Sequence, residues 1–400
     1  MGADELERAA AALEGSDPSA AAQATITRGE YVWQRGDQDS AFAYFDRARA
    51  LVEGAPLSRE KQYVIAQCAR FLALAGRNDE ALPLAEESIA MAEKLGDDDM
   101  LGDALNNRAI VRSNIGHRGW LEDSERSIEL LLRTNSFRVT RAYINFGSNL
   151  VDTAADLVRG EAATREGLAI GQRMGLPSTA IRWFVGNLAE LTYLAGKWDE
   201  ALALAEEVLA AEYHYQLTMA HGIRAAIRLG HGEAEGAVSD AEASLRDARA
   251  IRDPQALRPA LVTSAEVAYR TGETAAANGL LDELGMPEGA KGSWIVRAAL
   301  LCHDLDRELA VPVDGEPRNA WSDAALAIVR GDLERAADLL EPTGARTFEA
   351  AARLRAAIAQ AAAGRRPRAE AQLGRALAFY RQVGASAYAR EAEALLPAAS

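Results

Sequence analysis

A fixed spacing of small residues recurs along the chain. In the clearest copy Gly196 marks a tight turn, Ala189 lies seven residues before it and Ala201 lies five after it. Small side chains at those two points let two antiparallel helices approach closely, because neither holds the backbones apart. The same triplet of small residue, glycine and alanine recurs at Gly29/Gly36/Ala41, Ala69/Gly76/Ala81, Ala225/Gly232/Ala237, Ala265/Gly272/Ala277, Ala324/Gly331/Ala336 and Ala357/Gly364/Ala369. This spacing predicts a stack of helical hairpins.

The turn glycines also follow a nearly constant period. Gly36, Gly76 and Gly116 are 40 residues apart, and Gly196 follows after twice that interval. Such a period is typical of solenoids, in which each unit contacts mainly its neighbours along the chain. We therefore expect one elongated all-α array, although the length alone would suggest about two or three globular domains.

The pattern resembles the tetratricopeptide (TPR) repeat, in which a small residue in helix A and an alanine in helix B lock the hairpin. Positions further along helix B agree, as in Ala41, Phe45 and Ala48. The resemblance covers residues 22–384 and implies a right-handed α-solenoid of about nine hairpins with a C-terminal capping helix. It implies little about the ligand, since such repeats bind many unrelated molecules.

Breaks in the pattern divide the chain into four expected segments. These are an N-terminal helix or cap at 1–19, TPR-like repeats 1–7 at 20–284, an inserted helix and loop at 285–319, and repeats 8–9 with a C-terminal cap at 320–400.

The fourth repeat departs from the spacing. Asn149 and Asp156 stand where alanine and glycine are expected, and the nearby Gly147 and Gly160 suggest a local slip of register. Repeats usually depart from their pattern at caps, interfaces or binding sites.

Composition and charge argue against several classes of partner. The formal net charge is -15, which disfavours binding to nucleic acid or to anionic lipid. No run reaches 18 apolar residues, and residues 1–13 lack the apolar core of a signal peptide. Cys68 and Cys302 lie far apart within predicted helices. They favour buried thiols in a reducing cytoplasm over a disulfide framework.

No familiar catalytic motif occurs in the sequence. It lacks the phosphate-binding G-x-x-x-x-G-K-[ST] loop, H-E-x-x-H, C-x-x-C and G-x-S-x-G. His214 and His221 could share a helix face, but two ligands do not form a zinc site. We therefore expect a non-enzymatic protein with no cofactor, metal or catalytic residue. The alternative is an enzyme or enzyme-activating subunit with a site built from polar residues of the A helices.

Polar residues gather on the predicted A helices of the third to fifth repeats, which in TPR-like arrays face the concave side. Asparagine is a poor helix former, so several within helices suggest compensating hydrogen bonds. Beside arginine, asparagine can hold a peptide backbone or a carboxylate. The predicted binding residues are Asn106, Asn107, Arg112, Arg141, Asn145, Asn149, Arg182, Trp183, Asn187 and Tyr193. A second interpretation is a ladder in which the asparagines bridge adjacent repeats and satisfy one another.

The C-terminal stretches 347–355, 376–385 and 390–396 show a narrower resemblance. They are similar to the end of repeat regions in large bacterial signalling proteins that carry a STAND-type ATPase with a class III adenylate/guanylate cyclase or a LuxR-type DNA-binding domain. No motif of those other domains occurs here. The resemblance implies a cytoplasmic scaffold or sensor that binds a protein segment or small effector in its concave groove. The net charge and the lack of a long apolar run argue against a direct nucleic-acid or membrane partner, and the sequence leaves the oligomeric state and pathway open.

Overall fold

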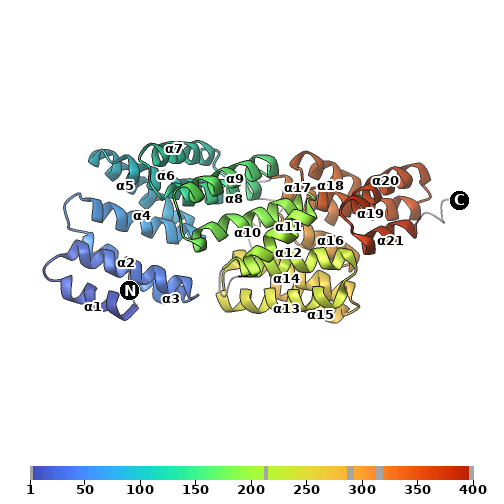
Figure 1. Cartoon of the computed structure of the whole chain (residues 1–400), viewed down its shortest axis with the longest axis horizontal. Helices are drawn as coiled ribbons and strands as arrows, with labels where there is room; N and C mark the ends of the chain where they lie inside the picture. The colour runs from blue at the N-terminus through green and yellow to red at the C-terminus, as the bar shows by residue number, and fades with distance from the viewer. Residues whose placement is uncertain (1–2, 211–214, 286–291, 312–318, 396–400) are drawn as a thin grey trace. The chain divides into compact units, whose positions relative to one another are not determined.

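The computed structural model describes residues 3–210, 215–285, 292–311 and 319–395. Within these ranges the chain forms 21 α-helices and one short 3₁₀ helix, and no strand (Figure 1). The predicted all-α solenoid class is confirmed. None of the described helices is both long enough and apolar enough to span a lipid bilayer.

The chain divides into two compact units, Met1–Phe146 and Gly147–Ser400, called here unit 1 and unit 2. Unit 1 contains α1 (Ala3–Leu13), α2 (Pro18–Gln34), α3 (Gln38–Val52), α4 (Arg59–Leu74), α5 (Asn78–Leu95), α6 (Asp98–Asn114) and α7 (Trp120–Arg133). Helix α8 (Val139–Asp152) runs across the boundary. The four segments expected from the repeat pattern stay a prediction.

Unit 2 contains the remaining helices. They are α9 (Leu157–Arg173), α10 (Ser178–Leu194), α11 (Trp198–Leu209), α12 (Leu217–His231), α13 (Ala234–Ile251), α14 (Pro254–Arg270), α15 (Thr274–Leu284), α16 (Trp294–Asp304), α17 (Ala320–Val329), α18 (Leu333–Leu340), the 3₁₀ helix η1 (Glu341–Thr343), α19 (Arg346–Ala362), α20 (Arg366–Gln382) and α21 (Ser386–Glu393).

Consecutive helices pair as hairpins around short glycine turns. In unit 1 the pairs are α2/α3, α4/α5 and α6/α7, and in unit 2 they include α10/α11, α12/α13, α14/α15, α17/α18 and α19/α20 (Figure 1). Gly76 has a φ of +77°, a left-handed conformation that glycine adopts without steric cost. The flanking Ala69 and Ala81 are fully buried. The small residues thus lie at the helix contact, as their spacing predicts.

The fourth hairpin keeps the same construction with different residues. Its turn residue is Ala155, which has a φ of +54°. A Cβ at Gly147 would lie 2.5 Å from the Thr164 hydroxyl oxygen, and one at Gly160 would lie 2.8 Å from a methyl carbon of Val151. Glycines therefore take the close-contact positions of α8 and α9, and the turn has moved by one residue. This is the slip of register that the sequence suggests.

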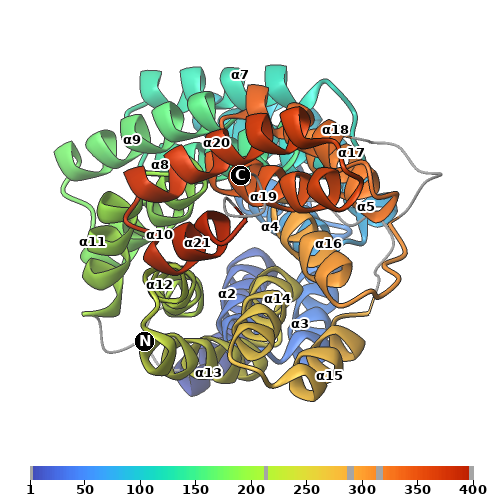
Figure 2. The same cartoon turned by 90° about the vertical axis from the view of Figure 1, so that its right-hand side faces the viewer.

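Unit 2 also joins helices that are far apart in sequence. The Trp321 indole on α17 donates a hydrogen bond of 2.7 Å to the Val151 carbonyl of α8. In Figure 2, α10, α12, α14 and α16 follow one another along an arc, and α19 and α21 lie on its inner side. The repeat pattern predicts contacts mainly between hairpins that are adjacent in sequence. The long-range contacts within unit 2 were not predicted. They arise because the curvature of successive hairpins brings α19 back against α10.

Candidate functional site

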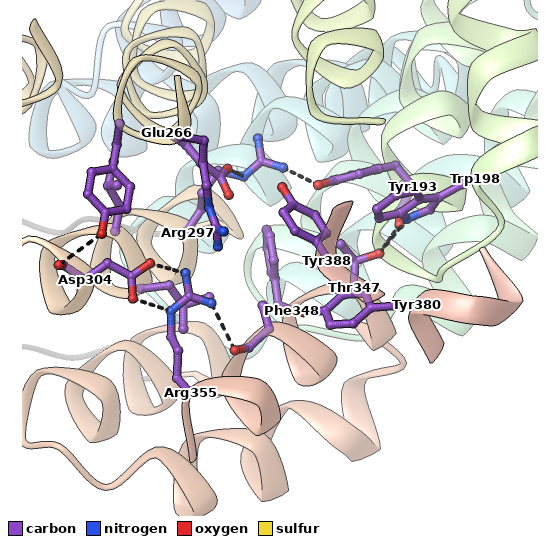
Figure 3. A pocket seen from close by; sticks show the side chains of 15 residues that line it. Tyr193, Trp198, Glu266, Arg297, Asp304, Thr347, Phe348, Arg355, Tyr380 and Tyr388 are labelled. Atoms are coloured by element: carbon purple, nitrogen blue, oxygen red, sulfur yellow. Dashed lines mark hydrogen bonds and ion pairs between the residues drawn. The ribbon is translucent and has the colours of Figure 1, made fainter. Parts of the chain in front are cut away.

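The inner side of unit 2 encloses a small cavity lined by aromatic and charged side chains (Figure 3). Its free volume is about 40 Å³, enough for a few water molecules and too little for a peptide side chain. The lining comes mainly from α14, α16 and α19, and α10, α11, α20 and α21 contribute one residue each. It includes Tyr193, Trp198, Arg270, Arg297, Arg355 and Tyr388.

Arg297 of α16 is the most connected of the lining arginines. It donates a 2.5 Å hydrogen bond to the Tyr193 hydroxyl and a 2.6 Å hydrogen bond to the Thr263 hydroxyl. Its Nε lies 3.4 Å from a carboxylate oxygen of Glu266. The guanidinium also lies over the rings of Tyr193 and Phe348, with its carbon 5.3 and 5.7 Å from their centres. These contacts compensate for removing the charge from water.

Arg355 of α19 forms a two-pronged ion pair with Asp304 at the end of α16. Its Nε donates to Asp304 at 2.8 Å, and an η nitrogen bonds the other carboxylate oxygen. The remaining η nitrogen donates to the Ala351 carbonyl at 3.0 Å. Burial works against the charge, but Asp304 holds the pKa of the Arg355 guanidinium above its ordinary value. The planar fork of arginine suits this geometry.

Arg270, the last residue of α14, faces helix α21. It forms an ion pair of 2.6 Å with Glu391, and its guanidinium carbon lies 5.0 Å from the centre of the Tyr388 ring. Its Nε is buried and has no hydrogen-bond partner among the described residues. A buried N–H donor without an acceptor is costly, so this atom is available to an oxygen that the described chain does not provide.

A chain of hydrogen bonds fixes one wall of the cavity. The Trp198 indole donates to the Thr347 hydroxyl at 3.0 Å, and that hydroxyl donates to the Tyr193 carbonyl at 2.5 Å. The three residues belong to α11, α19 and α10, and Thr347 lies 154 residues after Tyr193. The wall is therefore built from sequence-distant helices that hold each other in place.

Comparisons with known proteins bear on the fold. No protein-family model matches the sequence, and no curated protein has a similar sequence. A Rap protein solved in complex with Competence and Sporulation Factor is similar in structure, with a TM-score of 0.56 over 70% of this chain and 77% of its own, at 14% identity. The apo form of the quorum sensor NprR from B. thuringiensis is also similar, with a TM-score of 0.50 over 90% of this chain and 97% of its own, at 12% identity.

The protein has a TPR-like helical-repeat fold. At such low identity the two structures show the fold alone. The TPR-like resemblance expected from the spacing of small residues is confirmed, and the narrower resemblance to STAND-associated regulators stays a prediction. In this TPR-like unit 2 the cavity lies on the side of the A helices, because α10, α14 and α19 are the first helices of their hairpins.

Several of the residues predicted from the sequence bond to one another on the TPR-like A helices of unit 1. The Asn145 amide donates to the Asn106 side-chain oxygen at 3.1 Å. Asn107 donates to the Ala66 carbonyl at 3.0 Å and accepts from Arg141 at 3.1 Å. These bonds bridge α4, α6 and α8, which is the arrangement expected of a ladder. A ligand role for these residues stays a prediction.

Arg112, another predicted residue, forms an ion pair inside its own hairpin. Arg112 and Arg108 on α6 bond the two carboxylate oxygens of Asp123 on α7, at 2.8 and 2.7 Å. The Asp123 side chain is 5% exposed, so this pair of arginines compensates for a buried charge.

The same clamp recurs in unit 2. Arg224, Arg228 and His221 on α12 all bond to Asp240 on α13, at distances from 2.7 to 3.0 Å. Burial works against the charged form, but these hydrogen bonds and charges lower the pKa of Asp240 to about 2. His221 thus has a structural partner, whereas His214 lies outside the described residues. No group of three metal-ligating side chains occurs within the described ranges.

Three predicted residues lie on α10, outside the cavity lining. Asn187 accepts from the Gln216 amide at 2.8 Å, which bridges α10 and α12. Trp183 stacks on Tyr215 with ring centres 4.9 Å apart, and Arg182 is half-buried near the start of the helix.

Two predicted residues remain, and one of them reaches the cavity. Asn149 lies in the last turn of α8, where its carbonyl accepts from the Thr153 amide at 2.9 Å. Tyr193 lines the cavity and contacts Arg297.

The three arginines that line the cavity were not predicted from the sequence. Arg297 lies in the helix inserted between repeats, and Arg270 lies two residues before the repeat glycine Gly272, at a position that the spacing of small residues does not include.

Proposed function

We propose that this protein is a non-enzymatic TPR-like scaffold that binds a segment of another protein on the inner side of unit 2. The lining of the cavity carries the proposal. Three arginines stand there among four tyrosines and a tryptophan. Arginine, tyrosine and tryptophan are the residues that contribute most binding energy at protein interfaces.

The chemistry of this lining favours an acidic segment with an aromatic side chain. The guanidiniums of Arg270 and Arg297 already lie over aromatic rings, and an incoming ring that takes the place of Tyr388 can stack on Arg270 in the same way. The Nε of Arg270 can donate a hydrogen bond to a carboxylate oxygen, since its N–H is buried without a partner among the described residues.

We further propose that the protein acts as a sensor in bacterial signal transduction or transcriptional regulation, and that it works in the cytoplasm. The resemblance of residues 347–396 to signalling regulators supports it, as does the structural likeness to a Rap protein bound to Competence and Sporulation Factor and to a quorum sensor. The cysteines Cys68 and Cys302 are both free and buried, which is consistent with a reducing compartment. Burial raises the pKa of their thiols to about 12 and about 11, which keeps them unreactive.

A selection from a random peptide library displayed on phage tests the proposal. We expect the 400-residue chain to select peptides that combine acidic and aromatic residues. Arg270→Gln, confirmed as folded by circular dichroism, should weaken the selected peptides by about tenfold or more, because the peptide's carboxylate loses a hydrogen bond to a charged group. The matched control is Arg375→Gln on α20, whose side chain is 48% exposed. A selection without a reproducible peptide, or equal affinity for both variants, would contradict the proposal.

A further inference from the structure

Helix α21 already contributes an aromatic ring to the cavity lining and a carboxylate to one of the lining arginines. Tyr388 reaches in among the lining side chains (Figure 3), its ring centre 5.4 Å from that of Tyr380. A Cβ added at Gly230 would lie 3.2 Å from the Tyr388 ring, so α12 also contacts this side chain. Three residues later Glu391 forms the ion pair with Arg270. Residues three apart lie on the same face of a helix, so α21 presents both groups to the cavity at once.

The charges of the cavity balance only when α21 is present. The lining contains three arginines and two carboxylates, Glu266 and Asp304. Glu266 pairs with Arg297, and Asp304 pairs with Arg355. The carboxylate that pairs with the third arginine, Arg270, belongs to Glu391 on α21. Without α21 the cavity would hold one uncompensated buried cation, which is strongly unfavourable. Any segment that replaces α21 must therefore bring a carboxylate to Arg270.

The attachment of α21 to the rest of unit 2 is light. Of its eight residues Ala392 is the one that is buried. The Ser386 hydroxyl bonds the His231 carbonyl at 2.7 Å from an exposed position, and the ion pair of Glu393 with Arg381 is exposed as well. A helix of about two turns with so few buried contacts opens at low free energy. Tyr388 and Glu391 are the two residues of α21 that contact the tyrosines and arginines of the cavity lining.

We propose that α21 is an internal ligand that blocks the partner site of unit 2, and that the partner is a helical segment carrying an aromatic residue followed three positions later by Asp or Glu. This inference rests on the proposed function, because it concerns the same site. The partner's ring takes the place of Tyr388, and its carboxylate takes the place of Glu391 on Arg270. An occupied site lowers the apparent affinity for the partner by the fraction of time that the site is open.

The test uses a fluorescent synthetic peptide of residues 385–395 as the probe and the 400-residue chain as the receptor. The wild-type chain should bind the probe weakly, because its own α21 competes. The variant Tyr388→Ala/Glu391→Gln should bind it at least about tenfold more tightly, since the internal competitor has lost both anchors while the lining residues outside α21 are unchanged. The matched control is Glu393→Gln, two residues further along α21, which should bind like the wild type. A probe with Tyr388 and Glu391 replaced by alanine should not bind.

A second variant guards against an effect on folding. Glu391→Gln alone keeps the shape of the side chain and should give an intermediate gain in affinity. Equal affinity of the wild type and both variants would overturn the inference, and so would tighter binding of the probe with both anchors replaced. If peptides selected by display bind through Arg270 while the α21 variants bind them no better than the wild type, the inference fails and the proposed function stands. If neither the selected peptides nor the probe binds, both fail.

Discussion

Each arginine that lines the unit 2 cavity has a carboxylate within reach. Arg297 has Glu266 and Arg355 has Asp304, whereas Arg270 depends on Glu391 from the terminal helix. Breaking a buried pair by removing one partner leaves the other charge uncompensated. An acidic group must therefore always lie beside the buried Arg270 guanidinium, whether that group comes from α21 or from a partner.

Glu190 of α10 provides a pH-dependent test at this scale. Burial and then the nearby Asp152 raise the pKa of its carboxyl to about 7, and the Ser293 hydroxyl lies 3.5 Å away. The pKa in the folded chain is therefore above the ordinary value of 4.5. Between the two values the folded protein holds a proton that the unfolded chain has released, so stability falls as pH rises from about 4.5 to about 7.

The variant Glu190→Gln removes this titration. We expect it to be more stable than the wild type above about pH 7, by up to roughly 3 kcal/mol, and equal to it below about pH 4.5. Urea unfolding at pH 4, 6 and 8 measures the difference. Glu207→Gln, on the exposed face of α11, should follow the wild-type profile. A constant difference between Glu190→Gln and the wild type across this range would show that Glu190 does not titrate in the folded chain.

Single helices and their turns were the part of the structure best predicted from the sequence. The spacing of Ala189, Gly196 and Ala201 constrains a contact between two consecutive helices, which is a local matter of side-chain size. The fourth hairpin does not match the spacing of small residue, glycine and alanine, because its turn residue is Ala155 and its close helix contacts are made at glycines. A pattern of residue types does not find a hairpin in which other residues form the left-handed turn and the close helix contact.

Two turn glycines of unit 2 offer a matched test of how helices pack. Gly196 and Gly331 have φ angles of +77° and +75°. A Cβ at Gly196 would lie 2.5 Å from the Phe379 ring of α20, whereas one at Gly331 would have no atom within 4 Å. Gly331→Ala should cost about 1 kcal/mol of unfolding free energy from backbone strain. Gly196→Ala should cost about 2 kcal/mol more, because the ring must also move. Equal costs in urea unfolding would show that α20 does not pack on this turn.

The long-range closure of unit 2 could not be predicted from the sequence. Thr347 and Tyr380 occupy ordinary positions of late repeats, and Tyr388 lies in the C-terminal helix α21. Nothing in the repeat pattern pairs them with Tyr193 or Arg270. Their meeting depends on small rotations that accumulate from one hairpin to the next. The cavity was missed for the same reason, since its lining comes from helices more than 150 residues apart along the chain. The sequence did indicate that A helices carry the site, and Tyr193 was among the residues it selected.

At the scale of the whole molecule, we propose that unit 2 binds a protein segment at its inner cavity and that this segment displaces α21. Hydrogen-exchange mass spectrometry of the 400-residue chain, with and without a saturating display-selected peptide, tests this most directly. Backbone amides that a ligand covers exchange more slowly, and those of a displaced helix exchange faster. We predict slower exchange in α14, α16 and α19 together with faster exchange in α21. Slower exchange confined to unit 1 or to the outer helices α13 and α15, with α21 unchanged, would contradict it.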